Sequence, residues 1–198
     1  TLSAGTIHDT SFIHIFSNLE AEIKSVNDLS RGNCAKDKQI DRSVRESKVK
    51  SSTGNLFSIS VISEDFLNEL FQQILSTETI PFKHPDEGCY ARAHAIAMIL
   101  DEKGVNSAKV FLEGDLYFEA PYSRFNGRSE WRYHTAPIVK VVSAKGQESY
   151  MVIDPTLSSK PLLLDEWEKM VTANEYSEKA SLYMTKKYNY TPFDKDKE

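Results

Sequence analysis

The sequence has few cysteines and no long apolar run. Among 198 residues it has only two cysteines, Cys34 and Cys89, whereas small secreted domains held by disulfides carry more of them, in pairs. The fold is therefore not expected to depend on a disulfide framework, and two free thiols in a reducing compartment is the simpler interpretation. No apolar segment approaches the ~20 residues that a membrane helix needs, so no membrane partner is predicted.

The sequence also lacks an excess of basic charge. Its formal net charge is −5, and binding to nucleic acid needs a basic face that neutralises phosphates, so no nucleic-acid partner is predicted. Hydrophobic residues make up 40% of the chain and charged residues 27%, which is typical of a globular protein. No group of His, Cys, Asp and Glu has the spacing of a metal site, and no cofactor is predicted.

The chain divides near residues 48–55, a polar and turn-rich stretch that is typical of a linker. Residues 1–55 would then form an N-terminal segment, with strands expected at 12–16 and 21–26 and a highly charged stretch at 33–48. That stretch is predicted to be either a solvated helix or disordered. Residues 56–198 would form the second and larger domain.

Two helices and several strands are predicted in the larger domain. One helix begins after the capping hydroxyl of Ser63 and buries Phe66, Leu67, Leu70, Phe71 and Ile74 on one face. An apolar helix over 90–103 begins at Gly88-Cys89 and ends before Gly104. Strands are predicted at 109–112 and 116–119 around a turn, at 133–142 and 149–153 around a second turn, and at 181–190; residues 122–130 read as an exposed loop and 164–172 as a short helix. Helices followed by antiparallel hairpins indicate an α+β fold, with the apolar helix packed centrally on an antiparallel sheet.

Cys89 is a candidate nucleophile because it is expected at the start of a helix. The positive end of the helix dipole favours a thiolate and lowers the pKa of the thiol. Free N–H groups of the first helical turn can also stabilise an oxyanion. The alternative is a small buried hydrophobe, which is a common role for a free cysteine.

His134 and Asp154 are candidate partners of the thiol. If 133–142 and 149–153 form a hairpin, the two side chains face each other near its open end. Taken singly, His134 can be a structural histidine and Asp154 a turn-forming residue before Pro155. The order Cys, His, Asp, with the cysteine at a helix start, is nevertheless that of papain-like thiol enzymes. Three aromatic neighbours, Tyr90, Trp131 and Tyr133, either line a substrate slot or belong to the core.

Three motifs in this order resemble the bacterial protein-glutaminases. They are Gly-Cys-Tyr-Ala-Arg-Ala-His at 88–94, Trp-x-Tyr-His at 131–134 and Ile-Asp-Pro-Thr-Leu at 153–157. The resemblance covers roughly residues 61–157 and implies a papain-like fold, shared with transglutaminases. It also implies that Cys89 is the nucleophile, His134 its base and Asp154 the group that orients the base, so that glutamine side chains of proteins are deamidated to glutamate.

The resemblance carries further expectations about partners and location. Protein substrates with accessible glutamine are the expected partners, and residues 1–55 would be a pro-segment that covers the active site. We expect a bacterial protein that is secreted or delivered, such as an effector or toxin. Because the cysteine content is low, we expect it to act in the reducing cytosol of a target cell. Two alternatives remain open, namely a transglutaminase or cysteine peptidase of the same fold, and a domain of this fold that binds rather than catalyses.

Overall fold

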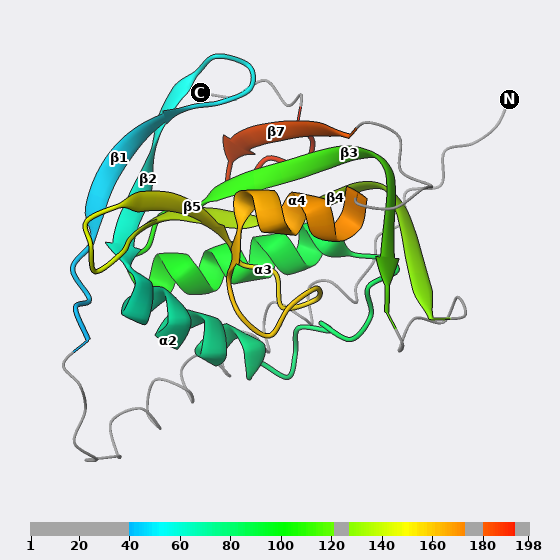
Figure 1. Cartoon of the computed structure of the whole chain (residues 1–198), viewed down its shortest axis with the longest axis horizontal. Helices are drawn as coiled ribbons and strands as arrows, with labels where there is room; N and C mark the ends of the chain where they lie inside the picture. Colours follow the sequence, from blue (N-terminus) through cyan, green and yellow to red (C-terminus); the bar gives the residue numbers. More distant parts are fainter. Residues whose placement is uncertain (1–39, 121–126, 173–179, 193–198) are drawn as a thin grey trace, which may run out of the picture.

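The computed structural model describes residues 40–120, 127–172 and 180–192, which form a mixed α+β fold (Figure 1). In these ranges, no helix is both long and apolar enough to cross a membrane. The elements in chain order are β1 (Arg45–Lys50), β2 (Leu56–Ser63), α2 (Glu64–Leu75), α3 (Cys89–Glu102), β3 (Ala108–Glu119), β4 (Arg128–Val142), β5 (Glu148–Val152), β6 (Leu162–Leu163), α4 (Leu164–Thr172) and β7 (Ser181–Lys186).

The sheet is built around the long strand β4. Its main path runs β1-β2-β4-β3-β7, and β5 pairs with the other side of β4 and with β6. The pairings are antiparallel except that β2 runs parallel to the end of β4, with Val61 opposite Lys140. Because β4 pairs with three strands, the side chains that it carries are fixed on both sides.

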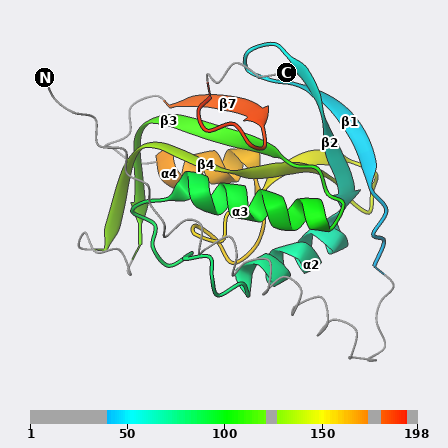
Figure 2. The same ribbon diagram turned by 180° about the vertical axis from the view of Figure 1, so that it is seen from behind.

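Helices lie on both faces of the sheet. Figures 1 and 2 show α3 and α2 on one face and α4 on the other. Two separate hydrophobic clusters match this arrangement, one joining α2 and α3 to Val139 and Val141, the other joining Trp167 of α4 to Ala136 and Ile138. The alternation of these β4 residues between the two clusters is what a strand buried on both faces requires.

The predicted helices are confirmed, and their ends have the expected chemistry. The Ser63 hydroxyl accepts a hydrogen bond from the Phe66 N–H at 3.1 Å and so caps α2. Gly88 precedes α3 with a left-handed φ of 76°, and Gly104 follows it with a φ of 72°. Helix α4 covers the predicted residues 164–172.

The hairpin predicted between 133–142 and 149–153 is confirmed as β4 and β5. Val139 lies opposite Met151, and Gly146, with a φ of 79°, lies in the connecting turn. This pairing brings the residue that follows β5, Asp154, back alongside β4.

Three expectations about strands and linkers were wrong. Residues 48–55 are not a linker but the end of β1 and the turn of the β1–β2 hairpin, so the sheet already begins at Arg45, inside the segment expected to precede the larger domain. Strand β3 runs unbroken through the predicted turn at 113–115, where a bulge shifts the register. Residues 128–130 belong to β4 rather than to a loop. The strands predicted at 12–16 and 21–26, and Cys34, lie outside the described residues.

Candidate active site

The site begins at the N-terminus of α3, where Cys89 is the first helical residue. The left-handed Gly88 turns the chain into the helix, and the Arg92 N–H donates to the Gly88 carbonyl at 3.0 Å, closing the first turn. The Cys89 side chain is 7% exposed and is a free thiol. It therefore lies at the positive end of the helix dipole, next to backbone N–H groups that have no partner within the helix.

His134 and Asp154 form a buried pair beside this helix end. The distance between His134 Nε2 and Asp154 Oδ2 is 2.7 Å, and the two side chains are 1% and 6% exposed. His134 is carried by β4, and Asp154 follows β5, its hairpin partner. The predicted facing of the two side chains at the open end of this hairpin is confirmed.

Asp154 accepts more than the imidazole bond. Trp167 Nε1 of α4 donates to Oδ2 at 2.9 Å, and the Thr156 N–H donates to Oδ1 at 3.2 Å. Burial by itself raises the pKa of this carboxyl, but the charge and hydrogen bond of His134, the Trp167 donor and the charge of Arg92 outweigh it and hold the pKa below its usual range. The carboxylate is thus kept ionised in a buried place.

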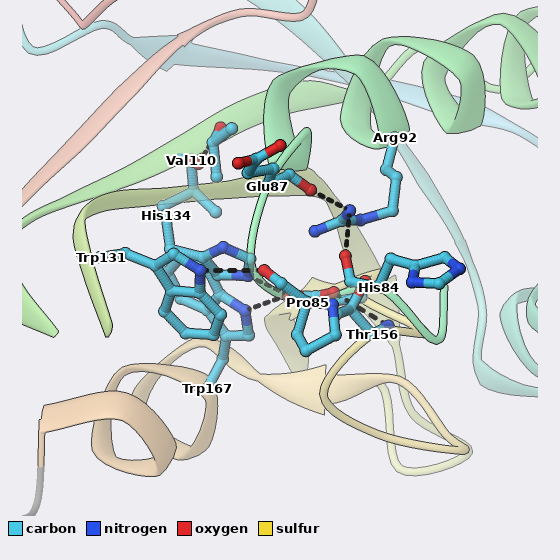
Figure 3. A network of polar contacts seen from close by, with 11 residues as sticks. His84, Pro85, Glu87, Arg92, Val110, Trp131, His134, Thr156 and Trp167 are labelled. Atoms are coloured by element: carbon cyan, nitrogen blue, oxygen red, sulfur yellow. Dashed lines mark hydrogen bonds and ion pairs between the residues drawn. The ribbon is translucent and has the colours of Figure 1, made fainter. Parts of the chain in front are cut away.

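The imidazole of His134 packs against two indole rings (Figure 3). Its centroid lies 4.6 Å from that of Trp131, with 16° between the planes, and 5.6 Å from that of Trp167, with 26° between the planes. Burial lowers the pKa of His134, but Asp154 more than compensates and, together with the Cys89 thiol, raises it to about 9. The ring is thus positioned by two aromatic neighbours and favoured in its protonated form.

The thiol and the imidazole are electrostatically coupled. Burial raises the pKa of Cys89, but interaction with His134 and the positive charge of Arg92 outweigh burial, so the net pKa falls below its ordinary value. Because Asp154 occupies Nε2 of the imidazole, Nδ1 is the nitrogen left for the thiol. Nδ1 is buried and has no hydrogen-bond partner within ordinary geometric limits, so the contact with sulfur is looser than a hydrogen bond. Such loose geometry is common in the absence of substrate.

An open cavity of about 650 Å³ adjoins the thiol. The three predicted substrate-binding aromatics, Tyr90, Trp131 and Tyr133, all line it together with Cys89. Tyr133 is 38% exposed, and its pKa is raised by burial and by the neighbouring Cys89. Only a small part of the Trp131 side chain is exposed, because its ring also packs on His134 and Phe118.

The loop that leads to Cys89 forms one wall of this cavity and is attached to β4. Trp131 Nε1 donates to the Pro85 carbonyl at 2.9 Å, and the Ser129 hydroxyl donates to Asp86 Oδ1 at 2.7 Å. Trp131 therefore has a second role that sequence alone did not indicate, because the same ring fixes the imidazole and the loop before the nucleophile.

The two other histidines in the described ranges, His84 and His94, have partners outside the Cys89–His134–Asp154 group. His94 packs against the rings of Tyr188 and Tyr190, at 4.7 and 6.1 Å between centroids, as expected for a scaffold residue. His84 lies in the loop before Cys89, where its backbone carbonyl accepts a hydrogen bond from Arg92. Among the described residues, no cluster of three or more His, Cys, Asp or Glu side chains is arranged to hold a metal ion.

Two residues of the site were missed by sequence reasoning. Trp167 touches both His134 and Asp154 but lies in a separate helix, and only its place on the apolar face of 164–172 marked it as buried. Arg92 lies inside the Cys89 motif, where its spacing of three residues from the cysteine was the available signal.

Comparisons with known proteins agree on one family. A family model described as glutaminase matches residues 67–171. The NMR structure of protein-glutaminase from Chryseobacterium proteolyticum is 32% identical, with 67% of this chain and 77% of that chain covered and a TM-score of 0.58. A crystal structure of protein-glutaminase is 31% identical over 64% of this chain and 74% of that chain, with a TM-score of 0.55.

A pro-form is also similar. The crystal structure of pro-protein-glutaminase is 28% identical, and the match covers 75% of this chain and 53% of that chain with a TM-score of 0.56. None of the curated proteins matches the chain significantly. The matched residues 67–171 contain Cys89, His134, Asp154 and both tryptophans, and the chain belongs to the glutaminase family that includes the protein-glutaminases.

Proposed function

We propose that this glutaminase deamidates glutamine side chains of proteins to glutamate, with Cys89 as nucleophile, His134 as acid and base, and Asp154 as the group that orients the imidazole. One observation carries the assignment of roles. A free thiol at a helix start is coupled to an imidazole whose other nitrogen lies 2.7 Å from a buried carboxylate, which is the arrangement that activates a thiol nucleophile.

In the first half-reaction, the Cys89 thiolate attacks the carbon of the γ-carboxamide. The C–S bond forms as the carbonyl π pair moves onto oxygen, and the backbone N–H of Cys89 is placed to stabilise the oxyanion. The His134 imidazolium then gives its proton to the leaving nitrogen, and the C–N bond breaks to release ammonia. A γ-glutamyl thioester and a neutral imidazole remain.

In the second half-reaction, water enters where ammonia left. Neutral His134 takes a proton from the water as its oxygen attacks the thioester carbon. The C–S bond breaks, and the thiolate and imidazolium are restored as glutamate leaves. Asp154 remains ionised throughout and fixes which nitrogen of His134 faces the sulfur.

The aromatic side of the cavity is suited to the aliphatic part of glutamine. Tyr90, Trp131 and Tyr133 line the space next to the thiol, and aromatic surfaces of this kind pack well against methylene groups. We assign them to substrate binding, with the carboxamide directed to Cys89.

We also propose that residues before β1 restrain the enzyme. Support comes from the similar pro-protein-glutaminase and from the order of the chain, in which this segment precedes the sheet. Because β1 begins at Arg45, the proposed segment ends before it rather than at residue 55. Removing residues 1–39 should raise the rate on a folded protein substrate; an unchanged rate would exclude restraint. Action in the reducing cytosol of a target cell stays a prediction that rests on cysteine usage alone.

Ammonia release from a glutamine-rich protein tests the assignment of the nucleophile. Cys89→Ala should abolish it, whereas Cys34→Ala, which retains the proposed nucleophile, should not. Mass spectrometry of the substrate separates three outcomes: amide replaced by acid means deamidation, amine adducts mean transglutamination, and chain cuts mean proteolysis. Undiminished ammonia release by Cys89→Ala would refute the mechanism.

A further inference from the structure

Arg92 is a buried cation next to the proposed nucleophile. Its side chain is 5% exposed, although arginine is almost never fully buried unless it is paired. It lies three residues after Cys89 on α3, so the two side chains share one face of the first turn. Helical side chains lean toward the N-terminus, which directs the guanidinium to the loop before the helix.

The guanidinium ties that loop to the helix. Arg92 Nη1 donates to the carbonyl of His84 at 2.8 Å and to that of Glu87 at 2.5 Å (Figure 3). These two carbonyls bracket the loop that forms the cavity wall and ends at Gly88. From the other side, Ser129 and Trp131 of β4 bind the same loop through Asp86 and Pro85. The loop is therefore clamped between α3 and β4.

The same side chain faces the reacting groups from behind. Arg92, Cys89, His134 and Asp154 together line a narrow enclosed gap between α3 and β4. Arg92 Nη2 is buried and has no hydrogen-bond partner, so part of its charge is not neutralised by a direct contact. Burial lowers the pKa of Arg92, and negative charge on Asp154 and on the Cys89 sulfur offsets only part of this cost of burying the cation.

We propose that Arg92 is a positioning residue for the deamidation. Its guanidinium fixes the His84–Glu87 loop through the two hydrogen bonds of Nη1, so that Gly88 and Cys89 present the thiol and the backbone N–H in one geometry, and its charge stabilises the thiolate before substrate binds. The inference rests on the proposed role of Cys89. It adds two separable contributions, a mechanical one that needs the two Nη1 hydrogen bonds and an electrostatic one that needs only the charge.

Two substitutions separate these contributions. Arg92→Lys keeps the charge, but its shorter side chain has no atom at the position of Nη1, and Arg92→Met removes both the charge and the hydrogen bonds. The rate of alkylation by iodoacetamide, followed against pH, reports the thiolate, and kcat and KM for ammonia release report the geometry. In Arg92→Met the alkylation midpoint should move to higher pH and kcat should fall by roughly 10- to 100-fold. In Arg92→Lys the midpoint should stay near that of the wild type while kcat still falls.

Two further variants serve as controls. Ser129→Ala loosens the same loop from the β4 side without removing charge, so it should lower kcat or raise KM with an unchanged alkylation midpoint. Arg42→Met removes a cation that pairs with Glu69 on α2 and should leave both readouts unchanged.

The outcomes distinguish the proposal from a merely structural role. A folded Arg92→Met with wild-type midpoint and wild-type kcat would overturn it, and so would an Arg92→Lys whose midpoint moves. If Arg92→Met does not fold, Arg92→Lys alone decides, because a wild-type kcat there means that the Nη1 hydrogen bonds to the loop do not affect catalysis. Loss of activity in Cys89→Ala is a separate result, so failure of the proposed nucleophile and failure of the Arg92 proposal are told apart.

Discussion

Each of the three side chains assigned to the reaction is held by a different kind of contact. Cys89 is placed by the backbone of a helix start, His134 by contacts with two indole rings, and Asp154 by three hydrogen-bond donors. The pKa shifts follow from these contacts, since the pKa of the thiol is lowered and the pKa of the imidazole is raised. These shifts favour the thiolate form of Cys89 and the imidazolium form of His134 in the resting site.

The pH dependence of two reactions should differ at the alkaline end. Ammonia release needs the His134 proton for the leaving nitrogen and should fall as the pH passes about 9, where that proton is lost. Alkylation of Cys89 by iodoacetamide needs only the thiolate and should persist. Measured together, the two profiles should diverge above that pH; parallel profiles would contradict the acid role of His134.

The raised pKa of His134 also affects stability. The folded value of about 9 lies above the ordinary 6.5, so protonation of His134 stabilises the folded state. This contribution is present in full when the pH is below 6.5. This contribution is lost as the pH rises through about 9. Urea unfolding at increasing pH should show the loss in wild type and not in His134→Ala. An equal loss of stability in both proteins would mean that another titrating group causes it.

Asp154→Asn should retain the shape of the site but lose the charge that favours the imidazolium. The pKa of His134 should fall toward its ordinary range, and kcat should drop by roughly 100-fold or more. NMR titration of the imidazole and steady-state ammonia release measure the two effects. A large loss of kcat with an unshifted imidazole would point to misfolding rather than to lost charge.

At the scale of elements, helix α4 supports the site from the opposite face of the sheet. Trp167 is fully buried and reaches both Asp154 and the imidazole. The amphipathic pattern of 164–172 predicted the helix correctly. It did not predict the indole–carboxylate bond, because that contact depends on how α4 docks and not on local spacing.

Trp167→Phe tests this support, since it keeps an aromatic ring but loses the donor to Asp154. A hydrogen bond to a charged group contributes about 1.5–3 kcal/mol, and we expect a stability loss of that order with a clear fall in kcat. Val171→Ala, one turn further along α4 and equally buried, is the matched control. It should cost about 1–2 kcal/mol from the two lost methyl groups with little change in kcat.

Local patterns predicted some elements and failed at others for identifiable reasons. The β4–β5 hairpin has β-branched strands and a Gly146 turn, so local sequence determines it. Strand β3 was predicted as two strands because Glu-Gly-Asp at 113–115 is typical of a hairpin turn. In the structure Gly114 has a φ of 152° and lies in a bulge of one continuous strand. Strand β1 was missed because its charged residues suit an exposed edge strand, where only Val49 is buried.

At the scale of the whole molecule, the sheet begins earlier in the chain than the composition suggested. Residues 41 and 42 already contact α2 and its cap: the Asp41 carbonyl accepts from Ser63 at 2.6 Å, and Arg42 pairs with Glu69. A chain that begins at residue 40 therefore keeps these contacts and all of β1, whereas a truncation placed after Arg45 removes part of the sheet.

Two truncations should separate restraint from folding. A chain that begins at residue 40 keeps all of β1 and should retain the cooperative unfolding of the complete sheet. A chain that begins at residue 51 lacks β1, exposes the edge of β2 and should melt at a lower temperature, since six residue pairs of the β1–β2 ladder are lost. Calorimetry of both decides. Equal melting temperatures would mean that β1 contributes nothing to the domain.

The stack of three rings gives the protein an optical probe of its own chemistry. The chain has two tryptophans, and both lie against His134. An imidazolium accepts an electron from an excited indole more readily than neutral imidazole does, so it quenches the emission more strongly. Tryptophan fluorescence should therefore brighten as His134 loses its proton near pH 9, and the titration of the proposed acid can be followed in the unlabelled protein without substrate.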